Sequence, residues 1–382
     1  MKIHTAAIYQ YTLPLECPIP LRQGPLTTRD GLLLRLEDPS GHFAWGEAAP
    51  LPGFSREDLA QCRRTLIDAA TALVDRDDAP DDGALAELSA FRSNGAHSAA
   101  YFAVESAWRN LVALTQDAMP WSRHRSPGQD TLHLNALLAG EVDDIASQAQ
   151  RAKEEGFRAV KLKVGRERMA DDLRLVEMVR DLIGPDTALR LDANQAWSLE
   201  DAVLFGKAAR KFNIAYIEEP CQAPFDLPSF HATTGVDYAV DESIQSLHDL
   251  VQRKAARPGE GVFRDLPVVP VVQGAKAIIW KPTLVHTPDL GQLLFEEIDA
   301  GQARSLVLSA SFETGVGIAA LAGYAARFAT PDTPVGLDTY RWITPDVLKE
   351  RLPMAGGSIH LPAIFAAGQQ VDTGRLTKVW PL

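Results

Sequence analysis

The apolar positions at the start of the chain follow a strand-like pattern that becomes helical near Ser55. The strand-like stretches, separated by the turn signals Asp30-Gly31 and Pro39–Gly41, are residues 2–13, 31–37 and 42–47. Helical spacing covers residues 55–74, 82–91 and 98–114. This order predicts a small α+β domain over residues 1–125.

From about His133 the pattern becomes a repeated strand, turn and amphipathic helix. The first helices, over residues 141–155 and 170–183, end at Gly156 and at Gly184-Pro185, which are typical stop signals. The repeat continues to residue 337 and gives eight strands. The predicted fold class is therefore α/β: a (β/α)7-8 TIM-type barrel over residues 126–344.

Two segments depart from the repeat. Prolines and a glycine interrupt the helical pattern before the sixth strand, which predicts an insertion around residues 255–274. After Asp338 the alternation stops, and the tail over residues 345–382 is rich in proline and glycine. We expect this tail to return to the N-terminal domain and complete it as a cap on the barrel.

Charged side chains stand at the ends of the strands. The segments that carry them are AVKLKVG (Lys161, Lys163), LRLDAN (Asp192), AYIEEP (Glu218, Glu219), AVDES (Asp241), IIWKP (Lys281) and VGLDT (Asp338). Because a barrel brings the carboxyl ends of all its parallel strands to one face, we expect these groups to meet there.

Asp192, Glu218 and Asp241 end three consecutive strands. Each acid by itself is better explained as a turn former or helix cap. Together they offer three hard oxygen ligands and favour a magnesium-type site, whereas zinc is disfavoured because no His or Cys accompanies them. Glu219 follows Glu218 directly and faces the other side of its strand, so we place it outside the ligand set.

Lys161 and Lys163 are two residues apart and therefore face the same side of their strand. The residues between and beside them are apolar, which directs the lysines into the barrel interior or its mouth, where the carboxylates balance their charge. A lysine close to a divalent cation and to another lysine loses its proton more readily, which suits a base near neutral pH. Lys163 is the candidate base, and Lys281 is expected across the barrel from it.

The segment LVLSASFETGVGIAAL around the seventh strand contains Gly315-Val316-Gly317. This resembles a dinucleotide-binding turn, but Ala320 occupies the place of the third glycine. A better interpretation is that Ser309, Ser311 and exposed amides at a helix N-terminus bind a substrate carboxylate. The alternative is a tight glycine turn that binds nothing.

Composition narrows the classes of function. A net charge of -12 over 382 residues argues against a nucleic-acid surface, and no basic run or long apolar stretch indicates a membrane partner. The three cysteines are widely separated and lack metal-site or disulfide spacing. These features favour a cytoplasmic protein that acts on a small molecule, and they leave the oligomeric state open.

The barrel motifs KLKVG, LRLDANQAW, YIEEP, VDES and IIWKPTL resemble those of the enolase superfamily, in its muconate lactonizing subgroup. Enolase-superfamily sites use a lysine or histidine base with magnesium. Within the subgroup, TTRDGLLLRL, WGEAAPLPGFS, LSASFETGVGIAAL and VGLDT are similar to the o-succinylbenzoate synthase family. That resemblance implies a carbon–oxygen lyase of menaquinone biosynthesis, which dehydrates 2-succinyl-6-hydroxy-2,4-cyclohexadiene-1-carboxylate with syn geometry.

The resemblance also implies roles for single residues. Asp192, Glu218 and Asp241 would bind Mg²⁺, with Mn²⁺ as a substitute; Lys163 would be the acid/base catalyst, and Lys281 would stabilise the enediolate. A loop over residues 22–28 would cover the substrate, and the implied substrate-binding residues are Lys161, Arg22, Ser309, Ser311 and Gly336.

Three alternatives remain open at this point. One is an N-acylamino acid racemase or dipeptide epimerase of the same subgroup, which needs both lysines as acid/base partners. The second is a nicotinamide-dependent oxidoreductase that uses the seventh-strand glycines, and the third is a non-catalytic carboxylate-binding barrel.

Overall fold

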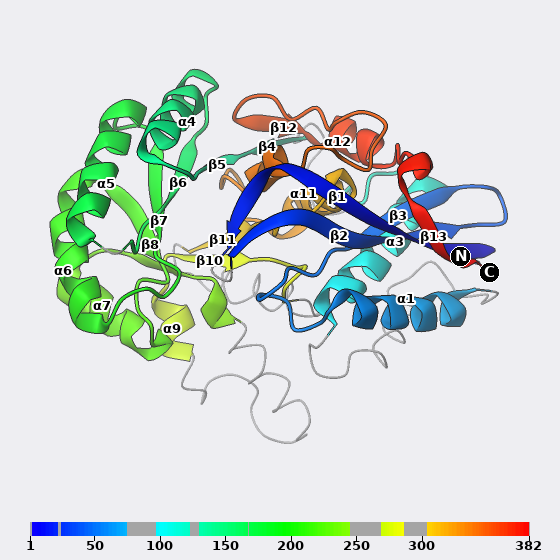
Figure 1. The fold of residues 1–382 in the computed structure, drawn as a ribbon, viewed down its shortest axis with the longest axis horizontal. Helices are drawn as coiled ribbons and strands as arrows, with labels where there is room; N and C mark the ends of the chain where they lie inside the picture. Colours follow the sequence, from blue (N-terminus) through cyan, green and yellow to red (C-terminus); the bar gives the residue numbers. More distant parts are fainter. Residues whose placement is uncertain are drawn as a thin grey trace.

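The computed structural model describes residues 2–21, 24–74, 97–122, 130–166, 168–244, 269–285 and 304–381. Arg22, the helix expected over residues 82–91 and most of the insertion expected around 255–274 lie outside these residues. The described chain forms a barrel with helices on its outside and a cap of strands and helices beside it (Figure 1).

The cap sheet is antiparallel and joins both ends of the chain. Its strands, in the order β13-β1-β2-β3, are β1 (Thr5–Leu21), β2 (Gly24–Glu37), β3 (Phe43–Ala48) and β13 (Thr377–Pro381). The C-terminal tail thus returns to the N-terminal domain as the strand that pairs with β1.

One face of this sheet carries two helices, α1 (Leu59–Leu73) and α3 (Ser98–Thr115). Leu32, Leu34 and Leu36 alternate along β2, and all three are fully buried in the cluster that these helices complete. Gly46 allows α3 to approach β3 closely, since a Cβ atom there would lie 1.9 Å from the carbonyl oxygen of Ala103.

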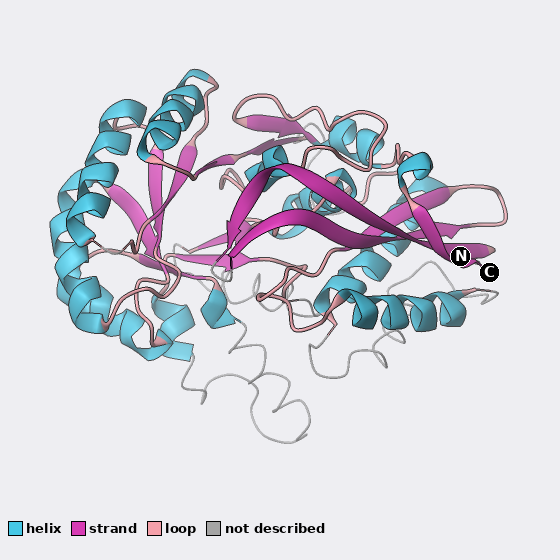
Figure 2. Ribbon diagram, viewed as in Figure 1, coloured by secondary structure: helices cyan, strands magenta, loops and turns pink. Residues whose placement is uncertain are grey.

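Two predictions in the cap were wrong. Helix α1 begins at Leu59 rather than Ser55, because Asp58 and Gln61 form a capping box at its start. Residues 24–28, which the resemblance implied as a loop, belong to β2, whose pairing with β1 continues past a shift in register between Pro14 and Ile19. Figure 2 shows both strands running side by side from the chain ends toward the barrel.

The barrel contains a seven-stranded parallel sheet in which each strand lies beside its neighbour in sequence. The strands are β5 (Asn135–Leu138), β6 (Ala159–Lys163), β7 (Ala188–Asp192), β8 (Ile214–Glu218), β9 (Tyr238–Val240), β10 (Ala277–Trp280) and β11 (Ser305–Leu308). The eighth strand expected at residues 335–337 is reduced to two parallel bridges, Val335 with Leu134 and Gly336 with Ser309. These bridges connect the two edges of the sheet, so the TIM-type barrel is confirmed.

Helices cover the outer face of the barrel. They are α4 (Val142–Glu154), α5 (Met169–Ile183), α6 (Leu199–Ala209), α7 (Leu227–Thr234), α9 (Val269–Gly274) and α11 (Gly315–Phe328), and α12 (Leu361–Gly368) packs against α11. The short strands β4 (Thr131–His133) and β12 (Ser358–His360) pair with each other, and the single-turn helices are η3 (Arg210–Phe212), η4 (Pro224–Asp226), η5 (Asp338–Trp342) and η6 (Thr373–Arg375). None of the described helices has both the length and the hydropathy needed to cross a membrane.

A separate small cluster fills the barrel interior. Its buried members come from successive strands and are Tyr216, Ala239, Ala277, Ile279 and Val307. Asp192 and Glu218 pair with each other one layer beyond Tyr216, whereas Lys161 is level with Tyr216 through Arg190. The apolar cluster therefore lies directly beneath the carboxylates, and the Lys161 ammonium reaches up to them from its own strand.

Candidate active site

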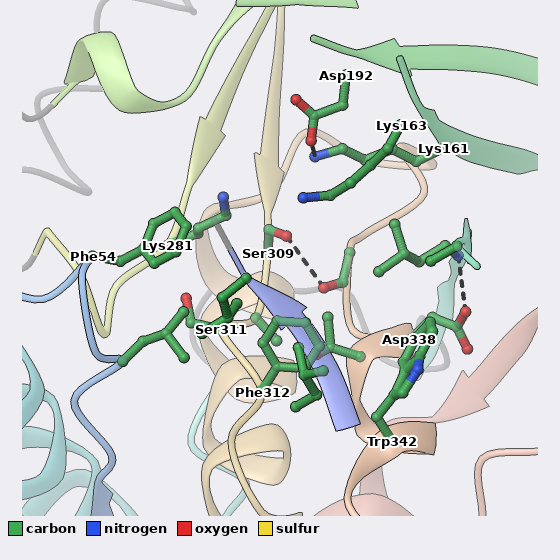
Figure 3. A pocket seen from close by; sticks show the side chains of 18 of the residues that line it. Phe54, Lys161, Lys163, Asp192, Lys281, Ser309, Ser311, Phe312, Asp338 and Trp342 are labelled. Carbon is green, nitrogen blue, oxygen red and sulfur yellow. Dashed lines mark hydrogen bonds and ion pairs between the residues drawn. The ribbon is translucent and has the colours of Figure 1, made fainter. Parts of the chain in front are cut away.

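Strand register brings the charged side chains together. Lys163 of β6 pairs with Asp192 of β7, and Asp192 pairs with Glu218 of β8. Asp241 and Lys281 follow directly after β9 and β10. Because all of these strands are parallel, the five side chains meet at the mouth of the barrel, as the sequence predicted; Figure 3 shows Lys163, Asp192 and Lys281 of this group.

The three carboxylates are buried and paired with lysines. Asp192, Glu218 and Asp241 are 2%, 1% and 7% exposed. The Nζ atom of Lys161 lies 2.9 Å from Oδ2 of Asp192 and donates a hydrogen bond of 2.7 Å to Oε1 of Glu218. The Nζ atom of Lys281 donates to Oδ2 of Asp241. Three carboxyl groups therefore share two ammonium groups in direct contact with them.

The pKa values show how crowded these charges are. Burial raises the pKa of Glu218 well above its ordinary value, and the carboxylate of Asp192 raises it further. Burial alone would raise the pKa of Asp192 too, but the lysines of the mouth, Lys161 first, lower it. Burial alone would lower the pKa of Lys161, yet the three carboxylates raise it well above its ordinary value. A divalent cation beside the three carboxyl groups would favour their ionised forms.

The donor set fits a hard divalent cation, since three buried carboxylates supply oxygen ligands of the kind Mg²⁺ prefers. Within the described ranges, no three His, Cys, Asp or Glu side chains are already grouped closely enough to hold a metal ion. The ammonium of Lys161 instead binds Asp192 and Glu218 together. The carboxylate oxygens that a metal ion would need are therefore present, but in this structure they are paired with lysine ammonium groups.

Glu219 directly follows β8, and its carboxylate lies apart from this cluster. Its carboxylate accepts hydrogen bonds from the N–H of Asp241 (2.7 Å), the N–H of Ser243 (2.8 Å) and the hydroxyl of Ser243 (2.7 Å). Glu219 has a φ of 43°, a left-handed conformation that is strained for a side chain of this size. It therefore fixes the backbone that presents Asp241.

Lys163 differs from the other two lysines in its surroundings. Its ammonium donates to Oδ1 of Asn194 at 3.1 Å, and Asn194 in turn donates to Oε1 of Glu242 at 3.0 Å. In Figure 3 the ammonium groups of Lys163 and Lys281 point toward each other from opposite sides of the mouth. A molecule in the mouth would therefore have one lysine on each side.

A cavity of about 110 Å³ opens between these lysines and the cap. Most of its wall is apolar, and the residues that provide this part are Ile19, Leu21, Leu51, Phe54, Leu137, Ala139, Leu284, Ala310, Phe312 and Trp342. Ile19, Leu21, Leu51 and Phe54 come from the cap, so both parts of the molecule form the cavity. The local sequence pattern gave no sign of this shared wall.

The predicted substrate-binding residues that the structure describes all line the cavity: Lys161, Ser309, Ser311 and Gly336. Ser309 donates to the carbonyl oxygen of Gly336 at 3.3 Å. The Oγ atom of Ser311 is buried and has no hydrogen-bond partner in the described structure, which leaves it available to a ligand.

The expectation that the N-terminal amides of α11 bind substrate was wrong. Glu47 of β3 accepts hydrogen bonds from the N–H groups of Thr314 (3.0 Å) and Gly317 (2.7 Å), and Asp346 accepts one from Gly315 (3.1 Å). These amides are buried and already occupied, because the cap and the C-terminal segment supply the carboxylates. The same contacts fill the place that a dinucleotide phosphate would need.

Asp338, which the sequence placed at the end of the last strand, lies in the cavity wall. Its Oδ2 atom accepts a hydrogen bond of 2.9 Å from the N–H of Leu137 and lies 3.6 Å from Nε of Arg341. Burial raises the pKa of Asp338 to about 6. Its position at the end of VGLDT was the signal that could have marked it as a wall residue.

Comparison with known proteins agrees with this geometry. The family model described as "Enolase C-terminal domain-like" matches residues 144–258, and the model described as "MenC, N-terminal domain" matches residues 3–91. With a metal-type acid cluster at the mouth of the barrel, these matches define a barrel enzyme of the enolase class.

Curated relatives narrow the class. The o-succinylbenzoate synthase of Klebsiella pneumoniae (strain 342) is 32% identical over 342 residues, which cover 88% of this chain and 91% of that protein. The o-succinylbenzoate synthase of Proteus mirabilis (strain HI4320) is 29% identical over 95% of this chain and 97% of that protein. The chain belongs to the o-succinylbenzoate synthase family.

Solved structures share the fold at lower identity. The L-Ala-D/L-Glu epimerase from Bacillus subtilis gives a TM-score of 0.78 at 20% identity, with all of both chains covered. The muconate lactonizing enzyme from Pseudomonas fluorescens gives 0.77 at 18% identity over 98% of both chains. These likenesses show the barrel and its cap, and they do not favour an epimerase over a synthase.

Proposed function

We propose that this chain catalyses the Mg²⁺-dependent syn dehydration of 2-succinyl-6-hydroxy-2,4-cyclohexadiene-1-carboxylate to 2-succinylbenzoate, as a lyase of menaquinone biosynthesis. The observation that carries the proposal is the placement of Lys163 and Lys281 on opposite sides of one cavity, beside three buried carboxylates. Membership of the o-succinylbenzoate synthase family supports the same reaction.

Asp192, Glu218 and Asp241 are the residues that would hold Mg²⁺, with Mn²⁺ as a substitute. When bound, the metal stabilises the negative charge that develops on the substrate carboxylate as the adjacent proton leaves. The buried cluster supports this assignment, because three carboxyl groups share two ammonium partners in direct contact.

Lys163 carries the proton through the reaction. Its neutral amine takes the proton α to the carboxylate, and the electron pair of the broken C–H bond passes into the enediolate. Collapse of the enediolate breaks the C–O bond of the ring hydroxyl group, and Lys163 returns the proton to this leaving hydroxide as water. Both events occur on one face of the ring, so a single lysine suffices.

Lys281 acts from the opposite face. It is ion-paired with Asp241 and contributes positive charge beside the enediolate without exchanging a proton with the substrate. The apolar wall suits a six-membered carbon ring, and the unpartnered hydroxyl of Ser311 can donate to a carboxylate. Arg22, together with Lys161, Ser309 and Gly336, completes the proposed substrate contacts.

The test follows the loss of the cyclohexadiene absorbance on addition of purified protein, with Mg²⁺ and with a chelator. We expect metal-dependent turnover, and we expect Lys163→Ala to lower kcat by about 10²-fold or more while the fold is retained. Absence of metal-dependent turnover by the wild type would refute the synthase assignment. Exchange of an α hydrogen of an N-acylamino acid or dipeptide from both faces would favour the racemase or epimerase instead.

A further inference from the structure

We propose that Arg29 is a positioning residue that sets the shape of the substrate cavity by holding together wall segments from the cap and from the barrel. This inference deepens the proposed function and rests on it for the identity of the substrate. Arg29 lies on β2 of the cap, does not line the cavity, and is only 1% exposed.

The guanidinium of Arg29 donates to backbone carbonyls of separate segments. In the cap, Nη1 donates to Pro50 at 2.9 Å and to Asp30 at 3.2 Å, and Nη2 donates to Ala49 at 2.5 Å. In the barrel, Nε donates to Phe312 at 2.8 Å and Nη2 donates to Ser311 at 3.4 Å. One buried side chain therefore fastens β2 to two segments that lie far apart in sequence.

Both fastened segments lead directly into the cavity wall. Ala49 and Pro50 precede Leu51, whose side chain lines the cavity, and Ser311 and Phe312 are wall residues themselves. Phe312 has a φ of 63°, a left-handed conformation that costs energy for an aromatic residue. The hydrogen bond from Nε of Arg29 to its carbonyl oxygen helps to hold this conformation and with it the direction of the ring.

The charge of Arg29 also acts on the same segment. Burial raises the pKa of Glu313, and the hydrogen bond from Thr283 and the charge of Arg29 lower it only in part. Glu313 accepts a hydrogen bond of 2.6 Å from the N–H of Ser311. The backbone of Ser311 is thus held from both sides, with its carbonyl oxygen bound by Arg29 and its N–H bound by Glu313, while its hydroxyl faces the cavity.

Lysine cannot replace arginine in this position. A guanidinium presents five N–H donors in a rigid plane, whereas an ammonium offers three donors at one point. An ammonium at this place can reach the carbonyls of one segment but cannot span both. Arg29→Lys therefore keeps the charge and removes the link between the cap and the barrel wall.

The experiment compares Arg29→Lys and Arg29→Met with wild type, and uses Glu47→Gln as a matched control. Glu47 is also buried at the junction of cap and barrel, but it binds Tyr11, Thr314 and Gly317, none of which lines the cavity. We expect both Arg29 variants to raise KM for the cyclohexadiene substrate about tenfold or more. We expect kcat to stay within about threefold of wild type, because Lys163 and the carboxylates stand on other strands.

Hydrogen exchange supplies a readout that does not depend on the substrate. Arg29→Lys should speed amide exchange over residues 49–54 and 309–312 together, whereas Glu47→Gln should speed it over residues 314–318. If the wild type shows no turnover, the proposed function fails, and the exchange pattern still decides the role of Arg29.

Several outcomes would overturn the proposal: a KM of Arg29→Lys within about twofold of wild type, an equal rise of KM in Glu47→Gln, or unchanged exchange over either wall segment. Loss of folding by both Arg29 variants would equally overturn it, because Arg29 would then serve stability alone.

Discussion

Replacement of Asp338 by asparagine should remove a pH-dependent loss of stability. Burial raises the pKa of this carboxyl group from 3.8 to about 6 in the folded protein. A group whose pKa is raised binds its proton more tightly in the folded state than in the unfolded state. Its protonated form therefore favours folding below about pH 4, and this contribution is lost as the pH rises from about 4 to about 6.

The size of the effect follows from the two pKa values. One pKa unit corresponds to about 1.4 kcal/mol, so ionised Asp338 lowers the free energy of unfolding by at most about 3 kcal/mol above pH 6. Asp338→Asn is neutral at every pH and keeps an oxygen that can accept the N–H of Leu137. Because Arg341 loses its carboxylate partner, we expect a gain between about 1 kcal/mol and that limit at pH 8.

The assay is urea unfolding followed by tryptophan fluorescence at about pH 4.5 and about pH 8. The difference in free energy of unfolding between Asp338→Asn and wild type should grow with pH. Glu177→Gln, at an exposed position of α5, serves as the control and should show no such growth. Parallel curves for Asp338→Asn and wild type over this range would refute the reasoning.

Two further substitutions test the site and the cap. Glu219→Gln should weaken Mg²⁺ binding about 10- to 100-fold in calorimetry, because the carboxylate that fixes the backbone of Asp241 is lost; an unchanged affinity would show that Glu219 does not support the metal site. Gly46→Ala should lower the free energy of unfolding by about 1–3 kcal/mol, because the new Cβ atom would lie 1.9 Å from the carbonyl oxygen of Ala103. Ala60→Ser, at the exposed start of α1, is the control, because Gly41 has a positive φ at which any side chain is strained. Equal stability of Gly46→Ala and Ala60→Ser would contradict the packing argument.

The barrel and its charged mouth could be predicted from the sequence because both depend on local order. Alternation along β6 places Lys161 and Lys163 on one side. Glu219 is separated from Glu218 as expected, although it lies just past the end of β8 in a left-handed conformation. Parallel strands in sequence order then bring these ends together without further information. The structure agrees with each of these steps.

What the sequence could not reveal depends on contacts between distant segments. The amides at the start of α11 resemble an open anion site until Glu47, far away in the chain, is found bound to them. Two other features also depend on contacts between segments far apart in the chain. They are the apolar cavity wall provided by Leu21 and Phe54 and the hydrogen bonds of the buried Arg29 guanidinium. Periodicity describes how a segment faces its neighbours but does not identify those neighbours.

The pairing of β13 with β1 has a mechanical consequence. The two strands are antiparallel, with Ala7 opposite Pro381 and Gln10 opposite Thr377, so both chain ends leave the ladder at the same end. A force that pulls these ends apart therefore loads the hydrogen bonds one after another, like a zipper, instead of shearing them together. Under such tension β13 would detach first, and the cap would open at its edge before the barrel bears any load.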